Sequence, residues 1–160
     1  MVKIGLQFKC SLENVTDVQP EEDDFRWYLK VKCLNCGEEN PNWIYATLQE
    51  CQPIKGGRGQ ANFVSHCKLC GRHNSLDILK DSIKPYKADD DNKYKTIVSF
   101  DCRGLEPTDF SPRVGFSAKG LETETKFNDI DLTEKEWADY DEQAQESVGI
   151  YEVTHKFVKL

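Results

Sequence analysis

Two pairs of cysteines with the same spacing are the residues of this chain best suited to chemistry. Cys33 and Cys36 lie in "VKCLNCGEEN", and Cys67 and Cys70 lie in "SHCKLCGRHN". Two intervening residues allow both sulfurs of a pair to bind one ion, and the glycine after each pair can adopt the positive φ that turns the chain back. The pattern predicts one structural Zn²⁺ per chain, held by these four thiolates.

Three other interpretations of the cysteine pairs compete with structural zinc. A redox dithiol usually stands at a helix N-terminus, whose dipole lowers the thiol pKa, but "CLNCGEENPNW" carries Gly and Pro where that helix would run. Two disulfides are a second alternative, and a loosely held metal that is passed on is a third. Four thiolates close the tetrahedron and leave no position for water or substrate, which favours a structural ion.

The remaining cysteines and the histidines are weaker candidates for chemistry. Cys10 and Cys102 alternate with apolar neighbours and are expected to be small buried hydrophobes. Cys51 has no base beside it in sequence. His66 is expected to have a structural role near the cysteines rather than to bind metal. His73 is expected to be exposed, and His155 is expected at the surface or in the core. Phosphate-binding loops, nucleophile elbows and zinc-protease or deaminase motifs are absent from the sequence, so we expect no enzyme.

Composition and charge limit the kinds of partner that the chain can bind. The 160 residues, 38% of them apolar, suit one domain or two small packed lobes. Neither a secretory signal nor a membrane-length apolar run is evident, so we expect a cytoplasmic or nuclear protein. Residues 1–88 have a net charge of +1 and residues 89–160 a net charge of −8. This balance disfavours nucleic acid and membranes as partners, although residues 51–88 are locally basic.

Most of the chain has the alternating pattern of half-buried strands. The segments 3–12 and 25–33 alternate apolar and polar residues, the second running directly into Cys33. Further strands are predicted over 42–51, 60–67 and 148–160, and the Pro- and Gly-containing segment 52–60 is predicted to be a turn or mobile loop. A short acidic helix is predicted within 132–147, where Thr133 and Glu136 have the spacing of a capping box.

Two segments of the chain resemble each other at a constant offset of 92 residues. "FKCSLENVTDVQP" begins at Phe8 and "FDCRGLEPTDFSP" begins at Phe100, with five identities and no gap. The repeat predicts two related β-rich halves, a zinc-binding lobe over 1–88 and an acidic lobe over 92–160, joined by a solvated connector at 89–91. Because only the first half carries the cysteine pairs, the second is expected to be stable on its hydrophobic core alone.

The chain resembles the eukaryotic CXXC-motif-containing zinc-binding protein family. The resemblance spans essentially the whole sequence and rests on "FRWYLKVKCLNCGEE", "GGRGQANFVSHCKLCGR", "DCRGLEPTDFSP" and the tail "EKEWADYDEQAQESVGIYEVTHKFVKL". It implies a β-rich fold of two related halves with one zinc on the four paired cysteines. The family carries no established catalytic activity.

These observations predict a monomeric, non-enzymatic zinc-binding protein that acts as a protein-interaction module. Its acidic C-terminal half and its basic 51–88 segment are the candidate contact faces. Zinc or copper handling is the alternative function, and an RNA-binding zinc ribbon, with Phe63 and Trp43 stacking on bases, or a thiol oxidoreductase is less favoured.

Overall fold

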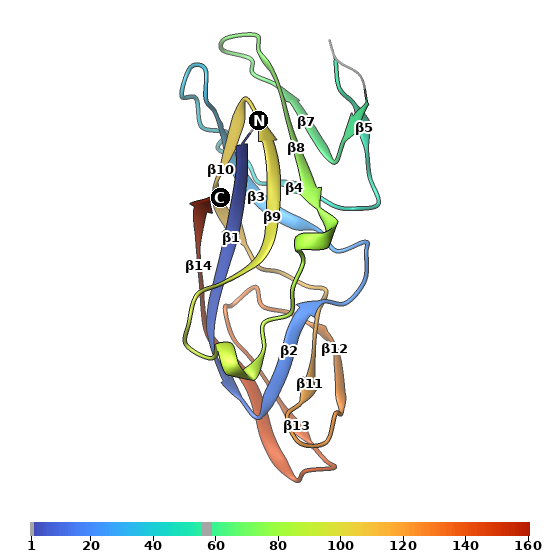
Figure 1. Ribbon diagram of the computed structural model, residues 1–160. Coiled ribbons are helices and arrows are strands. Elements are labelled where there is room, and N and C mark those ends of the chain that lie inside the picture. The colour runs from blue at the N-terminus through green and yellow to red at the C-terminus, as the bar shows by residue number, and fades with distance from the viewer. Residues whose placement is uncertain (1, 56–58) are drawn as a thin grey trace.

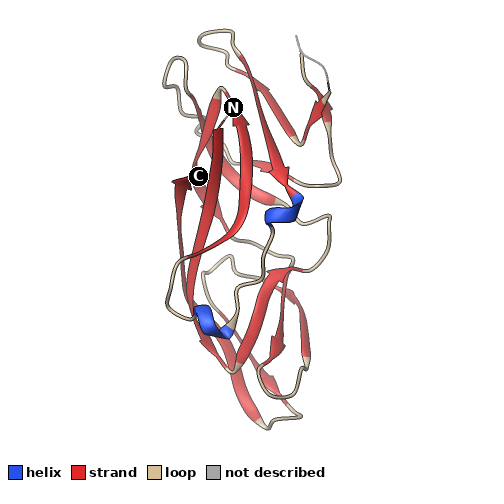
Figure 2. Cartoon of the chain, in the orientation of Figure 1, coloured by secondary structure: helices blue, strands red, loops and turns tan. Residues whose placement is uncertain are grey.

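The computed structural model describes residues 2–55 and 59–160 and consists mainly of β-strands joined by turns (Figures 1 and 2). The prediction of a mainly β fold is thereby confirmed. Within the described residues, helical structure is limited to the 3-10 turns η1 (Lys80–Ser82) and η2 (Ala88–Asp90). The strands are β1 (Val2–Glu13), β2 (Val15–Pro20), β3 (Trp27–Cys33), β4 (Ile44–Ala46), β5 (Gln52–Pro53), β6 (Gln60–Ala61), β7 (Phe63–His66), β8 (His73–Leu79), β9 (Lys95–Arg103), β10 (Leu105–Ser111), β11 (Phe116–Gly120), β12 (Lys126–Ile130), β13 (Trp137–Asp141) and β14 (Glu146–Lys159).

The described strands form one six-stranded sheet, two three-stranded sheets and the two-stranded sheet β5-β6, all antiparallel. The six-stranded sheet has the order β13-β14-β1-β9-β8-β7, and the three-stranded sheets have the orders β10-β3-β4 and β12-β11-β2. Figure 1 shows an elongated molecule with β1 and β9 along its middle. The β7–β8 turn lies at the upper end of the view and the β13–β14 turn at the lower end.

A single hydrophobic cluster between the sheets contains residues from both parts of the chain. Its members on β1 are the predicted alternating set, with Leu6 and Phe8 almost inaccessible to solvent. Trp27 of β3 is equally buried and lies edge-on to Phe100 of β9, with ring centroids 6.2 Å apart. Burial of such large apolar side chains provides the main driving force for packing β3 onto β1 and β9.

The predicted acidic helix within 132–147 is wrong, because this segment forms β13 and the turn into β14. Trp137 of β13 packs edge-on against Phe127 of β12, with ring centroids 5.5 Å apart. Thr133 does not close a capping box, since its hydroxyl and N–H both donate to the Asp131 carboxylate. Strand pairing and aromatic packing therefore outweigh the local helix propensity.

Two predicted strands are shorter than expected. Of the segment 42–51 only β4 is a strand, and it lies at the edge of its sheet. The segment 60–67 is divided into β6 and β7 at Asn62, whose N–H donates to Asp77 and whose side-chain oxygen accepts from the Ile78 N–H. The predicted 52–60 loop begins and ends in the paired strands β5 and β6, while residues 56–58 lie outside the described residues.

The strand order has an internal symmetry. It is unchanged when β1 is exchanged with β9, β2 with β10, β3 with β11, β4 with β12, β7 with β13 and β8 with β14. Leu6 pairs with Val98 at the centre of the six-stranded sheet, and these two residues are themselves 92 positions apart. Strands from before and after the 89–91 connector share this sheet, whereas the division into two lobes and the duplication stay predictions.

Candidate metal centre

The structure brings the sulfur atoms of Cys33, Cys36, Cys67 and Cys70 together at one end of the molecule, all within 4.8 Å of one another. Cys33 Sγ lies 3.7 Å from Cys70 Sγ, and Cys36 Sγ lies 3.6 Å from Cys67 Sγ. A tetrahedral ion with metal–sulfur bonds of about 2.3 Å requires sulfur–sulfur edges of about 3.8 Å. The cluster therefore has the size of a tetrahedral Zn²⁺ site.

The first cysteine pair lies in a tight turn at the end of β3, which we call the first knuckle (residues 33–37). The Gly37 N–H donates to the Cys33 carbonyl at 2.8 Å, and the Cys33 N–H donates to the Glu38 carbonyl at 2.9 Å. Gly37 has a φ of 79°, the left-handed conformation that its position was expected to need. The Leu34 N–H donates to the carbonyl of Gly104, which anchors the knuckle to the bend between β9 and β10.

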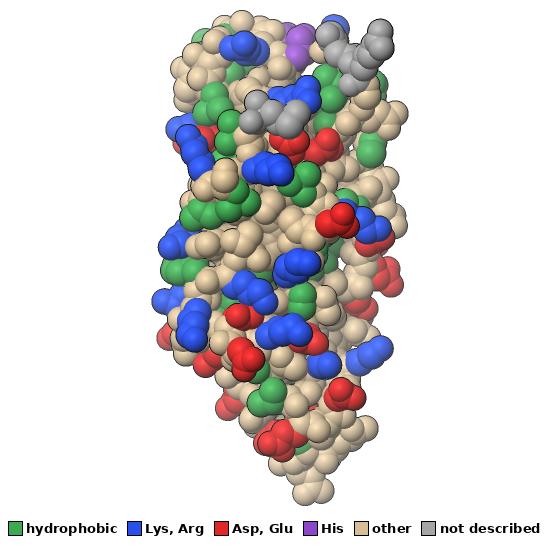
Figure 3. All heavy atoms as spheres, in the orientation of Figure 1, with side chains coloured by type: hydrophobic (Ala, Val, Ile, Leu, Met, Phe, Trp, Pro, Cys, Tyr) green, Lys and Arg blue, Asp and Glu red, His purple; other side chains and the backbone are tan. Residues whose placement is uncertain are grey.

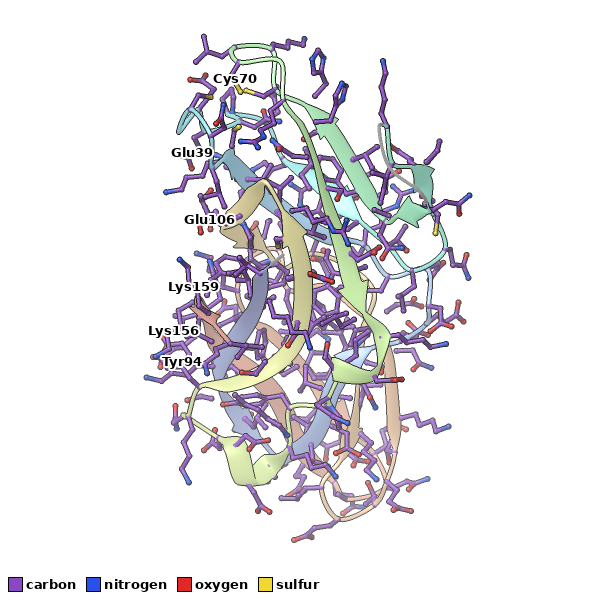
Figure 4. All side chains as sticks on the ribbon, turned by 45° about the horizontal axis from the view of Figure 1, so that its top comes forward. Glu39, Cys70, Tyr94, Glu106, Lys156 and Lys159 are labelled. Atoms are coloured by element: carbon purple, nitrogen blue, oxygen red, sulfur yellow. The ribbon has the colours of Figure 1, made fainter. Side chains whose placement is uncertain are left out.

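The second pair lies in a turn of the same geometry between β7 and β8, the second knuckle (residues 67–71), at the upper end of Figure 4. The Gly71 N–H donates to the Cys67 carbonyl at 2.8 Å, the Cys67 N–H donates to the Arg72 carbonyl, and Gly71 has a φ of 78°. Arg72 Nη1 also donates to the Asn35 side-chain oxygen of the first knuckle at 2.9 Å. This contact between the two knuckles was not expected from the sequence.

The thiol pKa values within the cluster differ strongly from one another. The Cys36 backbone N–H, donating to the Cys33 sulfur, is the main cause that lowers the pKa of Cys33 to about 6. The pKa of Cys70 is lowered mainly by the Asn35 side chain. The Glu38 N–H favours the thiolate of Cys36, but desolvation and the three neighbouring thiols outweigh it and raise that pKa to about 12. A divalent cation among the four sulfurs would offset the repulsion that keeps them from ionising together.

The other cysteines lie apart from the cluster. Cys10 and Cys102 are buried in the hydrophobic core, as predicted, and burial raises the pKa of each thiol to about 12. Cys51 is exposed in the segment between β4 and β5, where the Asn62 side-chain nitrogen lies 3.8 Å from its sulfur. Within residues 2–55 and 59–160, none of these three belongs to a group of side chains that could hold a metal ion.

The histidines also lie outside the cluster of candidate ligands. His66 and His73 face each other across the β7–β8 hairpin, with their rings stacked 4.5 Å apart. They form the purple patch at the top of Figure 3, next to the second knuckle. His155 lies on β14, where its Nε2 is 3.1 Å from an Asp109 carboxylate oxygen, and burial is the main cause that lowers its pKa.

The β11–β12 turn of the second half repeats the backbone geometry of the first knuckle without cysteines. The Gly120 N–H donates to the Thr125 carbonyl at 2.7 Å, and the Glu124 N–H donates to the Gly120 carbonyl at 3.2 Å. Gly120 therefore occupies the position of Cys33, and Glu124, with a φ of 59°, occupies that of Gly37.

The β13–β14 turn likewise repeats the second knuckle. Asp141 pairs with Glu146 across this turn, as Cys67 is joined to Arg72 in the first half. The Gln145 residue has a φ of 55°, at the position that Gly71 occupies in the second knuckle. Asp141 therefore occupies the position in the β13–β14 turn that Cys67 occupies in the second knuckle.

The Asp141 carboxylate joins these two turns of the second half. It accepts hydrogen bonds from the Thr123 and Thr125 hydroxyls and from the Gln143 and Ala144 N–H groups. The residue is only 1% exposed, and the Thr123 hydroxyl is the main cause that holds its pKa below the ordinary value. The second half therefore contains a buried polar network in addition to its hydrophobic core, which the sequence analysis did not predict. No local sequence signal identifies the network, because its threonines lie 16 and 18 residues from Asp141.

Comparison with known proteins identifies the family. The family described as "CXXC motif containing zinc binding protein, eukaryotic" matches residues 5–158. The chain belongs to this family. The resemblance noted in the sequence is thereby confirmed, and together the family and the four-cysteine cluster indicate a zinc-binding protein.

Relatives match the whole chain of this family member. It is 62% identical to "UPF0587 protein v1g245604" of Nematostella vectensis over 160 residues, the full length of both. It is 60% identical to the "CXXC motif containing zinc binding protein" of Homo sapiens, over 99% of both chains. The "Crystal Structure of C1orf123" superposes with a TM-score of 0.95 at 59% identity, over 99% of both chains.

A more distant solved structure shares the fold alone. The "Hypothetical protein from plasmodium falciparum" superposes with a TM-score of 0.89 at 23% identity, over 99% of this chain and all of that one. The name of the Homo sapiens relative describes zinc binding and no enzymatic reaction. Among the described residues, no helix is long and apolar enough to cross a membrane.

Proposed function

We propose that the four cysteines bind one Zn²⁺ per chain and that this ion has a structural role. The sulfur–sulfur distances of 3.6 and 3.7 Å, which fit a tetrahedral ion, are the observation that carries the proposal. The ion would join two turns that are otherwise connected across their tips by the exposed Arg72–Asn35 hydrogen bond. It would thereby fix β3 and the β7–β8 hairpin relative to each other.

Native mass spectrometry with elemental analysis tests this proposal. One zinc per folded chain is expected for the wild type, and none for a variant with both Cys36→Ser and Cys67→Ser. The Cys10→Ser and Cys51→Ser variants are matched controls, each of which should keep one zinc. Wild-type protein that is folded and has no affinity for zinc would refute the proposal.

Metal handling is the second candidate function, and the exposure of the site favours it. Cys36 and Cys70 are exposed and Cys67 is partly so, while only Cys33 is buried. A partner could therefore reach the ion from solvent. Competition with a mild chelator separates the two functions, since a structural ion should be retained for hours and a delivered ion released within minutes.

We also propose that the chain is a monomeric, non-enzymatic protein that binds other proteins. The closed four-thiolate coordination supports this, because it leaves no position at which an ion could activate water or substrate. Affinity capture with the zinc-loaded chain, against the Cys36→Ser, Cys67→Ser chain as control, tests for a partner that requires the folded first half.

The symmetric strand order further supports our proposal that the chain arose by duplication of one β-rich unit.

A further inference from the structure

The outward side of β3 and β4 carries aromatic and cationic side chains next to one another. β3 points Trp27 and Leu29 into the core, and the alternate residues lie on the opposite side. Tyr28 pairs directly with Tyr45 of β4, with ring centroids 5.9 Å apart. In Figure 1 β3 passes behind β9, and Trp27 of β3 packs against Phe100 of β9, so the opposite side of β3 faces away from the six-stranded sheet. We name it the β3–β4 outer face, made by Arg26, Tyr28, Lys30, Trp43, Tyr45 and Arg113.

Each cation of the β3–β4 outer face lies over an aromatic ring. The distances to the ring centroid are 4.4 Å for Arg26 over Tyr45, 4.0 Å for Arg113 over Tyr28, and 5.0 Å for Lys30 over Trp43. Stacking orders these cations on the surface while they keep their charge. None of the three forms an ion pair with a residue in the described part of the chain. The face thus presents three positive charges without carboxylate partners.

The equivalent face of the second half has a different composition. The alternate residues of β11 are Ser117 and Lys119, without an aromatic side chain. Lys119 is neutralised by ion pairs with Asp17 at 3.3 Å and Glu124 at 3.7 Å. The fold itself therefore does not require rings or unpaired cations at this position.

The composition of the β3–β4 outer face suits a protein partner. Trp, Tyr and Arg are the residue types that most often dominate protein–protein binding energy. Carboxylates border the face on both sides, with Glu50 accepting from the Tyr45 hydroxyl at 3.0 Å and Glu106 paired with Lys32 at 3.2 Å. A continuous phosphate backbone would pass close to these carboxylates, and the chain's net charge of −7 would also repel it. The separate acidic side chains of a protein partner, by contrast, can be placed away from Glu50 and Glu106.

We propose that the β3–β4 outer face binds an acidic, extended segment of a partner protein, a proposal that rests on the protein-binding role proposed above. Residues four apart on a strand are separated by roughly 13 Å, so an extended segment can place two carboxylates near Arg26 and Lys30. The residue midway between them then lies over the stacked pair of Arg113 and Tyr28, where an aromatic side chain can pack on the guanidinium. The expected segment therefore alternates acidic and aromatic residues along one side.

Nuclear magnetic resonance on the zinc-loaded, ¹⁵N-labelled full chain tests the proposal. The probe is a 12-residue peptide with three repeats of Ser-Glu-Ser-Phe, and the control peptide has Lys in place of Glu. The acidic peptide should shift the indole N–H of Trp43, whereas those of Trp27 and Trp137 should stay in place. The Arg26→Glu, Arg113→Glu variant should bind about tenfold more weakly or worse. The Lys126→Glu, Lys159→Glu variant is the control with the same change in charge, and its affinity for the acidic peptide should change less than about twofold.

Several outcomes would overturn the proposal. These are the absence of a Trp43 shift, equal binding of the Lys peptide, or unchanged affinity in the Arg26→Glu, Arg113→Glu variant. If a 12-nucleotide oligouridylate binds more tightly than the acidic peptide, the ligand of the face is nucleic acid and not a protein segment. If charge reversal lowers the melting temperature, the milder Arg26→Gln, Arg113→Gln pair gives the same comparison. Zinc content measured on the same samples reports separately on the proposed metal site.

Discussion

The two ends of the molecule contain the same pair of turns, held together in different ways. At one end, the two knuckles bring Cys36 Sγ to 3.6 Å from Cys67 Sγ. At the other end, the equivalent turns are joined by the hydrogen bond from Thr123 to Asp141. The closing backbone hydrogen bonds of the first knuckle recur in the β11–β12 turn, and the positive φ of Gly71 recurs at Gln145 in the β13–β14 turn. Turns of similar backbone geometry are thus linked by different side chains at the two ends.

This difference predicts that one half depends more strongly on a ligand than the other. The Asp141 network consists of groups supplied by the chain itself, and it is complete once the chain has folded. The four thiols of the first half have divergent pKa values and need a cation in order to ionise together. We therefore expect the first half to need its zinc and the second half to be indifferent to it.

Removal of two candidate ligands should have the largest effect. The Cys36→Ser, Cys67→Ser variant is expected to lose all zinc and to melt at least roughly 10 °C lower than the wild type, because the knuckles lose their connection. Differential scanning calorimetry with metal analysis measures both quantities. The Cys102→Ser variant serves as a control for cysteine loss with the zinc retained. A melting temperature unchanged by loss of the ion would show that the zinc is dispensable for stability.

Replacement of Asp141 should have a smaller effect, confined to the other end. Asp141→Ala leaves the hydroxyls of Thr123 and Thr125 without their acceptor and is expected to lower the melting temperature by roughly 5 °C. Zinc content should stay at the wild-type value. The Asp139→Ala variant on the same strand is the control, because Asp139 is exposed. Loss of zinc from the Asp141→Ala protein would contradict the independence of the two ends.

Alanine at the turn glycines should distinguish backbone strain from steric conflict. A Cβ at Gly37 would meet nothing within 4 Å, so Gly37→Ala should cost only the positive φ, about 1 kcal/mol. A Cβ at Gly120 would lie 2.6 Å from Asp141 Oδ2 and 2.6 Å from Thr123 Oγ1. Gly120→Ala should therefore be the more destabilising change in urea unfolding. The reverse order would show that the Asp141 network can shift at little cost.

The Asp141 network should also have a defined pH dependence. The pKa of Asp141 is lowered in the folded state, mainly by the Thr123 hydroxyl, so its stabilising effect is complete above the unfolded-state value of about 3.9. That effect should be lost as the pH falls through the lower, folded-state pKa. The difference in unfolding free energy between wild type and Asp141→Asn is thus expected to be constant from about pH 5 to 7 and to shrink below about pH 4. A difference that grows on acidification would contradict the assignment.

Local patterns in the sequence predict much of the first half of the fold. The alternation over residues 3–12 and 25–33 gives the buried faces of β1 and β3, because strand residues alternate sides. The C-x-x-C-G spacing predicts the knuckles, since the geometry of each depends on five consecutive residues, the last of which is a glycine with positive φ. The convergence of the two knuckles follows from their shared cysteine chemistry. These features could be predicted because each depends on residues that are close in sequence or matched in type.

Long-range contacts account for what the sequence did not predict. The helix expected within 132–147 is replaced by β13, because pairing with β14 and the contact between Trp137 and Phe127 are invisible in the local pattern. The Asp141 network was missed for the same reason. The stacking of Arg113 on Tyr28 joins residues 85 positions apart, so the β3–β4 outer face could not be assembled from sequence either.

Amide hydrogen exchange with and without zinc is the most direct test of the structural role of the ion. Chelation of the metal should speed exchange at the Cys33, Gly37, Cys67 and Gly71 N–H groups, which close the two knuckles. The Gln143 and Ala144 N–H groups, bound to Asp141 at the other end, should exchange at unchanged rates. Unchanged protection of the knuckle amides after complete removal of zinc would contradict a structural role for the ion.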